Sequence, residues 1–250
     1  MNFWQGVLVL FAGMWAGTIN TVVGSGTLVS FPVLLSVGLP PITANVSNTV
    51  GLFPGSFVGA YGYRRELEGQ RSRVLTLLSA TVAGSTLGAI LLLVLPAGAF
   101  KAVVPALIVL ALVLVVFGPR ITKALAARGR AADDQVHWPL WVATFGVGIY
   151  GGYFGAAQGV LMMAFLGLML RETIQRQNAV KNILAGTVNL VAAIVFVASS
   201  HIDWAAAGLI AVGSVCGGLI GARIGRRLSP TALRAVIVVV GVAAIVKLLV

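Results

Sequence analysis

The sequence is poor in the residues from which metal sites, disulfide frameworks and proton relays are built. Its 250 residues include two histidines, six acidic side chains and one cysteine, Cys216. A single cysteine excludes a disulfide framework and a thiolate metal site. The acids fall in loops or at the ends of apolar runs, so none is placed to relay protons or bind sodium inside a membrane; they are Glu66, Glu68, Asp133, Asp134, Glu172 and Asp203. We therefore expect no metal and no cofactor.

A catalytic constellation is lacking too. An intramembrane serine protease needs a serine nucleophile and a histidine base embedded in the membrane. Ser25 is flanked by glycines, but the position two residues before it is Val23, and His137 and His201 both fall in predicted loops. We predict that the protein is not an enzyme.

Charged residues are scarce, at 9% of the chain, while 59% of the residues are hydrophobic and the mean hydropathy is +1.02. That balance is typical of an all-α integral membrane protein with several spans, and it makes the lipid bilayer a partner. The net charge of +11 comes from 17 Lys and Arg residues clustered in short loops between apolar runs. Because the positive-inside rule explains this clustering, we expect no nucleic-acid partner.

The apolar runs, which we expect to be helices, cover residues 6–23, 28–37, 42–63, 74–95, 100–118, 139–154, 160–170, 179–199, 204–222 and 233–250. At about 1.5 Å per residue, the run 28–37 is too short to cross a hydrocarbon core of roughly 30 Å. The pattern restarts after a basic cytoplasmic linker at 119–138. We predict two repeats, 1–118 and 139–250, each a broken or re-entrant helix pair followed by three transmembrane helices.

Residue matches between the two halves support the repeat. Gly17 and Gly24 recur with the same spacing as Gly148 and Gly155, and Asn48 recurs as Asn182. The loop 64–73 carries four arginines, while its counterpart around residues 201–203 carries no Lys or Arg. At the other two pairs of corresponding loops the basic residues also lie mainly in one half, but there it is the second half that carries them. The positive-inside rule then predicts an inverted repeat with both termini outside.

The stretch 17–49 is the wrong kind of sequence for a plain membrane-spanning helix, because glycines, prolines and hydroxyl and amide side chains interrupt it. Irregular backbone survives at membrane depth only where protein or water covers it, and matched broken segments point to a transporter's binding site. Backbone amides and hydroxyls at a half-helix N-terminus can bind an oxyanion. The predicted substrate-binding residues are Asn20, Thr21, Gly24, Ser25, Gly26, Thr27, Asn48 and Thr49 in the first copy, and Gly155, Gln158, Lys181 and Asn182 in the second.

Several of these residues also have a purely structural interpretation. The glycines around Ser25 could merely allow close helix packing, and Asn48 could cap a helix. Lys181 could pair with an anion, or it could be a cytoplasmic-end lysine whose amine reaches water. Gln158 could serve as an interhelical hydrogen-bond partner. The pairs Gly84/Gly88 and Gly217/Gly221 are predicted to be small-residue helix contacts.

The motifs Gly13-Met-Trp-Ala-Gly17, Gly24-Ser-Gly26, Phe31-Pro32 and Gly38-Leu-Pro-Pro41 resemble the opening signature of the sulfite exporter TauE/SafE family. The resemblance covers essentially the whole chain. It implies a transporter of the bacterial inner membrane for small anions such as sulfite or organosulfonates, with export as the expected direction. From the broken segments we predict alternating access around a midplane site. An anion channel or uniporter remains an alternative, and assembly into a homo-oligomer is left open.

Overall fold

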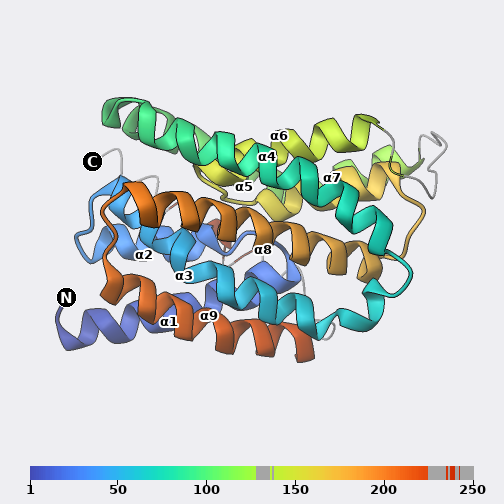
Figure 1. Cartoon of the computed structure of the whole chain (residues 1–250). Helices are drawn as coiled ribbons and strands as arrows, with labels where there is room; N and C mark the ends of the chain where they lie inside the picture. Colours follow the sequence, from blue (N-terminus) through green and yellow to red (C-terminus); the bar gives the residue numbers. More distant parts are fainter. Residues whose placement is uncertain (128–135, 137, 225–234, 236, 240–241, 243–250) are drawn as a thin grey trace.

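The computed structural model describes residues 1–127, 136, 138–224, 235, 237–239 and 242, and its regular elements in these residues are helices (Figure 1). They are α1 (Phe3–Val22), α2 (Thr27–Ser36), α3 (Pro41–Gly62), the 3₁₀ turn η1 (Arg64–Leu67), α4 (Arg71–Val94), α5 (Ala97–Ala127), α6 (Trp138–Tyr153), α7 (Gln158–Met169), α8 (Ile174–Ser199) and α9 (Trp204–Ile224). The prediction of an all-helical protein is confirmed for this part of the chain.

Five of the described helices are long and apolar enough to cross a membrane: Phe3–Val22, Arg71–Val94, Gly98–Gly118, Ile174–Ser199 and Trp204–Arg223. The helices α2 and α7 are shorter, as the short runs at 28–37 and 160–170 predicted. Helix α3 is long enough, with 22 residues, but Asn45, Ser47 and Asn48 lower its hydropathy. Helix α5 continues to Ala127, past the expected end at Gly118. Most of the predicted final run, 233–250, lies outside the described residues.

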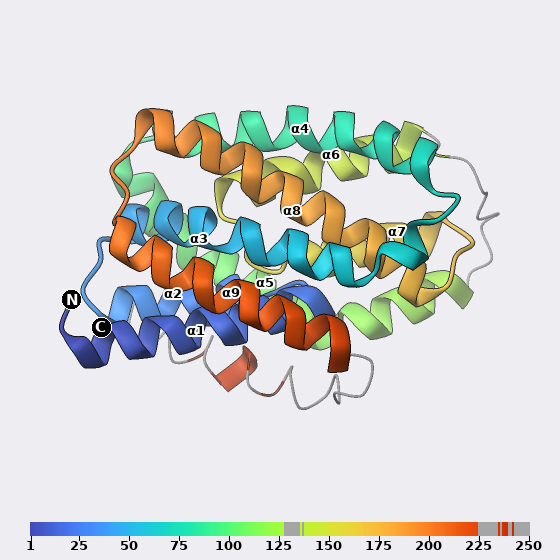
Figure 2. The same ribbon diagram turned by 60° about the horizontal axis from the view of Figure 1, so that its bottom comes forward.

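The helices form three layers (Figures 1 and 2). The middle layer consists of α3 and α8, which pack on each other. Helix α8 also packs on α4, which packs on α6, and α3 packs on α9, which packs on α1. The polar helix α3 and the lysine-bearing helix α8 therefore lie in the interior of the bundle, where their polar residues are shielded from lipid.

Glycines bring the outer pairs of helices into backbone contact. In α4, a Cβ added at Gly84 or Gly88 would overlap the carbonyl oxygen of Phe145 or Ile149 of α6. In α9, a Cβ added at Gly217 would overlap the carbonyl oxygen of Met14 of α1. The prediction that these glycines mediate helix contacts is confirmed, because only a residue without a side chain fits at this separation.

Two hairpins enter the bundle from opposite ends. The α1–α2 hairpin begins and ends at the left of Figure 1, whereas the α6–α7 hairpin begins and ends at the right. Each hairpin turns inside the bundle, at residues 23–26 and 154–157. Neither α2, with 10 residues, nor α7, with 12, is long enough to cross to the far end.

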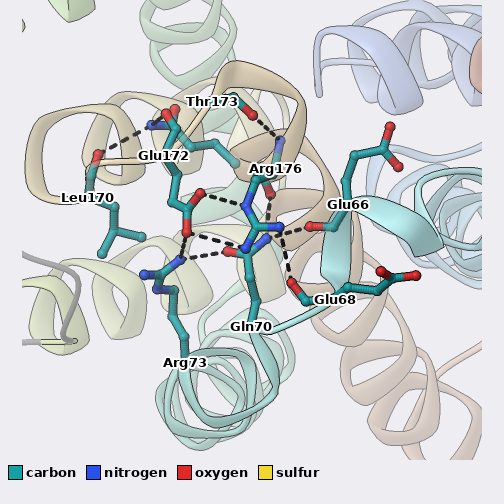
Figure 3. A network of polar contacts seen from close by, with 9 residues as sticks. Glu66, Glu68, Gln70, Arg73, Leu170, Glu172, Thr173 and Arg176 are labelled. Carbon is teal, nitrogen blue, oxygen red and sulfur yellow. Dashed lines mark hydrogen bonds and ion pairs between the residues drawn. The ribbon is translucent and has the colours of Figure 1, made fainter.

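One end of the bundle carries a network of ion pairs (Figure 3). Glu172, in the loop before α8, bonds Arg73 at the start of α4 at 2.8 Å and Arg176 at 2.6 Å. Arg176 also donates to the carbonyl oxygen of Glu68, at 3.0 Å. We call this the basic end; its arginines include Arg64, Arg65, Arg71, Arg73, Arg171 and Arg176. The loops at the opposite end, 37–40, 95–96 and 200–203, contain no Lys or Arg.

Candidate functional site

The turns of the two hairpins meet. In the first, Gly24 adopts a φ of +89°, a conformation that favours glycine. In the second, Gly155 has a φ of +73° and Ala157 a φ of +60°. The amide of Gly159 donates a 3.0 Å hydrogen bond to the carbonyl oxygen of Gly24. The two interrupted segments, far apart in the sequence, thus share one location inside the bundle, which we call the hairpin junction (residues 23–27 and 155–159).

The C-terminal end of α1, at the hairpin junction, is covered by side chains of α8. The amine Nζ of Lys181 donates to the carbonyl oxygens of Asn20, at 2.8 Å, and Thr21, at 3.2 Å. Asn178 Nδ2 and Asn182 Nδ2 also donate to the Thr21 carbonyl, at 3.1 and 3.4 Å. A helix C-terminus carries roughly half a negative charge, so a lysine and two amides stabilise this end.

The C-terminal end of α6 is covered in a related way by α3. Asn45 Nδ2 donates a 3.0 Å hydrogen bond to the carbonyl oxygen of Tyr153, the last residue of α6. Each hairpin therefore has the negative end of its first helix capped by a long helix from the other half of the chain. The two caps differ in charge, since Asn45 is neutral and Lys181 can carry a positive charge.

The N-terminal ends of α2 and α7 are not covered in this way. The Gly26 amide donates to Asn20 Oδ1 at 2.6 Å, but the amides of Ser25 and Thr27 donate no hydrogen bond among the described residues. The same holds for the amides of Ala156 and Ala157 in the other turn. Free amides at a helix N-terminus attract anions, because each such end carries roughly half a positive charge.

Several buried polar side-chain atoms around the junction also lack a partner among the described residues; they are Ser25 Oγ, Asn45 Oδ1, Asn48 Oδ1, Gln158 Oε1 and Asn178 Oδ1. The nitrogens of all four amides are bonded. Those of Asn45 and Asn178 donate to helix-end carbonyls, as described above, while Asn48 Nδ2 donates to Thr27 Oγ1 at 3.4 Å and Gln158 Nε2 to Asn189 Oδ1 at 3.2 Å. Folded proteins pair nearly all their buried polar atoms, so a group of unpaired ones is typical of a place where a ligand or water binds.

The fold brings most of the predicted site residues together at this junction. Eleven of the twelve are buried and Asn20 is partly exposed. Thr21 takes part through its carbonyl oxygen, because its hydroxyl bonds Gly17 O at 2.9 Å. The Thr49 hydroxyl bonds Asn45 O within its own helix at 3.0 Å, so it makes no contact with the junction through a hydrogen bond. The Gln158–Asn189 bond fits the interhelical interpretation of Gln158.

Lys181 is 0% exposed, so the expectation of an amine that reaches water is wrong. Its partners are backbone carbonyls rather than solvent. The site prediction missed two residues that bond the helix ends at the junction, Asn45 and Asn178. Their spacing offered a signal, because Asn45 precedes Asn48 by three residues and Asn178 precedes Lys181 by three. Residues three or four apart share one face of a helix.

Apolar helices packed around two interrupted hairpins that meet inside the bundle form the architecture of a multi-pass membrane transporter. The chain belongs to the sulfite exporter TauE/SafE family, whose family model matches residues 9–248. The chain is similar to "Probable membrane transporter protein YfcA" of Escherichia coli (strain K12), with 26% identity over 97% of this chain and 88% of that protein. It is also similar to "Probable membrane transporter protein" of Haemophilus influenzae, with 24% identity over 92% and 89%. A third relative, "Probable membrane transporter protein ORF9" of Sinorhizobium sp, is 26% identical over 95% and 90%.

Proposed function

We propose that this protein carries small anions across the membrane by alternating access around the hairpin junction. The proposal rests on the distribution of charge and hydrogen-bond donors at the junction. The two negative helix ends, those of α1 and α6, are capped by Lys181, Asn178, Asn182 and Asn45. The two positive ends, those of α2 and α7, keep amides free. The junction is therefore positive on balance, and it presents N–H and O–H donors to an anion.

The substrate class we propose is a sulfur oxyanion or an organosulfonate, and the physiological direction is export. An SO₃ group offers three acceptor oxygens in a tripod. The amides of Ser25 and Thr27 and the Ser25 hydroxyl can supply donors to such a group from one turn. The amide of Asn48 can add one more if it is rotated so that its NH₂ faces the ligand. The description of the family as sulfite exporters supports the same chemical class.

Alternating access requires two halves that can move against each other, and we propose that residues 1–118 and 139–250 are inverted repeats. The glycine contacts support this, because α4 meets α6 through Gly84 and Gly88 as α9 meets α1 through Gly217 and Gly221. The opposite entry of the two hairpins supports it as well (Figure 1). We place the basic end in the cytoplasm and both termini outside, following the positive-inside rule.

A carrier accounts for the junction better than an open pore does. Backbone atoms of the two turns are in direct contact at Gly24 and Gly159, and Ser25 and Asn48 are each 1% exposed. A carrier passes through such an occluded arrangement in each cycle, because its site opens to one side at a time. An open channel would keep its polar groups continuously wet.

Counterflow in proteoliposomes tests the proposal. Vesicles preloaded with unlabelled sulfite or sulfoacetate should take up the labelled anion transiently, and Ser25→Ala and Asn48→Ala should each raise the half-saturating concentration roughly tenfold, the value of about one hydrogen bond to a charged group. The matched control is Thr76→Ala, since the Thr76 hydroxyl is exposed and bonds its own helix at Ser72 O. Counterflow unchanged in both variants would refute the site. An ohmic single-channel current would establish a pore instead.

A further inference from the structure

Lys181 is the one charged residue that is buried among the described residues, and its amine contacts the C-terminal end of α1 at the hairpin junction. Its amine contacts two backbone carbonyls, and no carboxylate forms a hydrogen bond or ion pair with it among the described residues. A positive charge is thus held in the interior by helix-end dipoles and amide oxygens alone.

The elements packed against α8 bring no counter-ion to this amine. They are α1, α3, α4, α6, α7 and η1. Their titratable and charged residues are Tyr61 in α3, Arg64, Arg65 and Glu66 in η1, Arg71 and Arg73 in α4, and Tyr150 and Tyr153 in α6, with none in α1 or α7. Arg176 of α8 itself, like Arg73, pairs with Glu172 at the basic end (Figure 3).

A buried ammonium without a counter-ion is costly, because burial removes its hydration and no opposite charge replaces it. Two events can remove this cost. An anion can bind at the junction close to the ammonium, or the amine can give up its proton to water. The bound anion and the bound proton therefore favour each other, so they bind and leave together.

The protonation state of Lys181 also reaches the anion-binding turn through hydrogen bonds. The amine holds the carbonyl oxygen of Asn20, and the side chain of Asn20 accepts from the Gly26 amide at 2.6 Å. Gly26 lies between Ser25 and Thr27, whose amides are free. Loss of the proton leaves two N–H donors for the two carbonyls but removes the charge that strengthens both hydrogen bonds. The weaker contact with the α1 end loosens the turn that would hold the anion.

The same geometry argues against sodium as the coupling ion. In carriers built on broken helices, the carbonyl oxygens at a half-helix C-terminus are where Na⁺ is coordinated. Here the ammonium of Lys181 fills that place, 2.8 Å and 3.2 Å from the carbonyl oxygens of Asn20 and Thr21.

We propose that Lys181 binds the coupling proton of this carrier, one proton for each anion, an inference that rests on the proposed anion transport. In each cycle the neutral amine takes a proton from the side on which the anion binds. It returns that proton to water on the side to which the anion is released. A monovalent anion then crosses without net charge, so its movement responds to the pH difference and to the anion gradient but not to a membrane potential. Export proceeds when the outward anion gradient exceeds the inward drive of an outside-acid pH difference.

Proteoliposomes with labelled isethionate test this inference. Isethionate is a suitable probe because its sulfonate remains a monoanion across the pH range, whereas sulfite itself changes charge near neutral pH. Counterflow at equal pH measures the carrier alone. Accumulation under an outside-acid pH difference, with the potential clamped by potassium and valinomycin, measures coupling. For one proton per anion, the wild type should accumulate isethionate roughly tenfold per pH unit, with no response to a sodium gradient.

Two variants assign the coupling to Lys181. Lys181→Met and Lys181→Gln should raise the half-saturating concentration for counterflow, because the anion loses a neighbouring positive charge. The flux that remains at saturating anion should show no accumulation driven by the pH difference and should respond to a membrane potential. Lys181→Gln keeps N–H donors for the carbonyls of Asn20 and Thr21, so it separates loss of the titrating group from loss of the cap. Arg120→Gln, which removes an exposed charge from α5, is the matched control and should behave as the wild type does.

The outcomes separate the two proposals. If the wild type shows counterflow but does not accumulate isethionate under a pH difference, the assignment of the proton site is wrong, while the proposal of an anion carrier is unaffected. Accumulation driven by the pH difference that persists in both Lys181 variants would overturn it as well. Absence of counterflow for isethionate, sulfite and sulfoacetate in the wild type would overturn the proposed function, and this inference with it.

Discussion

Gly24 and Gly159 join the two hairpins through their backbones, with the amide of Gly159 donating to the carbonyl oxygen of Gly24 at 3.0 Å. A Cβ built on Gly24 would lie 2.5 Å from Gly159 Cα, so neither position has room for a side chain. The contact joins segments of the two predicted repeats. It fixes the spacing between the free amides of one turn and those of the other.

Gly24→Ala should be strongly destabilising, because a Cβ would strain the φ of +89° and also clash with Gly159. We expect a loss of about 3 kcal/mol, from the left-handed backbone and overpacking together. Gly38→Ala is the matched control, since Gly38 has a φ of +97° but nothing within 4 Å of the added Cβ. It should cost about 1 kcal/mol. Thermal unfolding in detergent measures both, and equal losses would contradict the proposed clash.

A second pair of substitutions tests the packing of α9 on α1. At Gly217 a Cβ would overlap the carbonyl oxygen of Met14, whereas at Gly208 in the same helix nothing lies within 4 Å. Gly217→Ala should lower the melting temperature by several degrees. Gly208→Ala should raise stability by about 0.5–1 kcal/mol, because alanine favours the helix. A stabilising Gly217→Ala would show that the two helices are further apart than the structure places them.

Acid should weaken the network at the basic end. Partial burial raises the pKa of Glu172, but hydrogen bonds and charge from Arg176 and Arg73 outweigh it, so the pKa is lowered from its usual value. A carboxyl whose pKa is depressed in the folded protein stabilises it above the unfolded pKa, and this stability is lost as the pH falls through the folded pKa. We expect a contribution of about 1 kcal/mol, which begins to be lost once the pH falls below the ordinary pKa of a glutamate, about 4.3.

Melting temperatures recorded between pH 3 and pH 7 measure this effect. Glu172→Gln should be less stable than the wild type at pH 7 and should show a smaller loss on acidification. Glu68→Gln is the control, because Arg176 bonds the main-chain oxygen of Glu68 and not its side chain (Figure 3). An acid response in Glu172→Gln equal to that of the wild type would assign the response to another group.

The proposed orientation can be tested by cysteine labelling. Cys216 is the sole cysteine of the chain and is exposed on α9, so Cys216→Ala provides a background free of thiols. In intact cells, an impermeant maleimide should label Ser200→Cys and should spare Gly69→Cys until the membrane is opened. The reverse pattern would place the basic end outside the cell and invert the proposed topology.

The helical elements followed from the sequence because they depend on local composition. Continuous apolar runs indicated the spans, and glycines near residues 24 and 155 indicated the interruptions, since turns with positive φ favour residues with special backbone freedom. The candidate residues Ser25 and Asn48 followed from the same reasoning, because unusual polar groups stand out in an apolar chain. Helix α5 exceeded its predicted end because residues 120–127 are less apolar than the span but include strong helix formers, among them Arg120, Lys123 and three alanines.

The sequence by itself determined that this chain crosses a membrane and that its apolar helices are interrupted at two related places. The tertiary structure alone decided what those breaks contact. Lys181 meets the carbonyls of Asn20 and Thr21, and Asn45 meets that of Tyr153, over separations of 161, 160 and 108 residues. Hydrogen-bond partners that distant are set by how helices pack, not by the residues beside them. Packing therefore decided which helix ends are covered and which remain free for an anion.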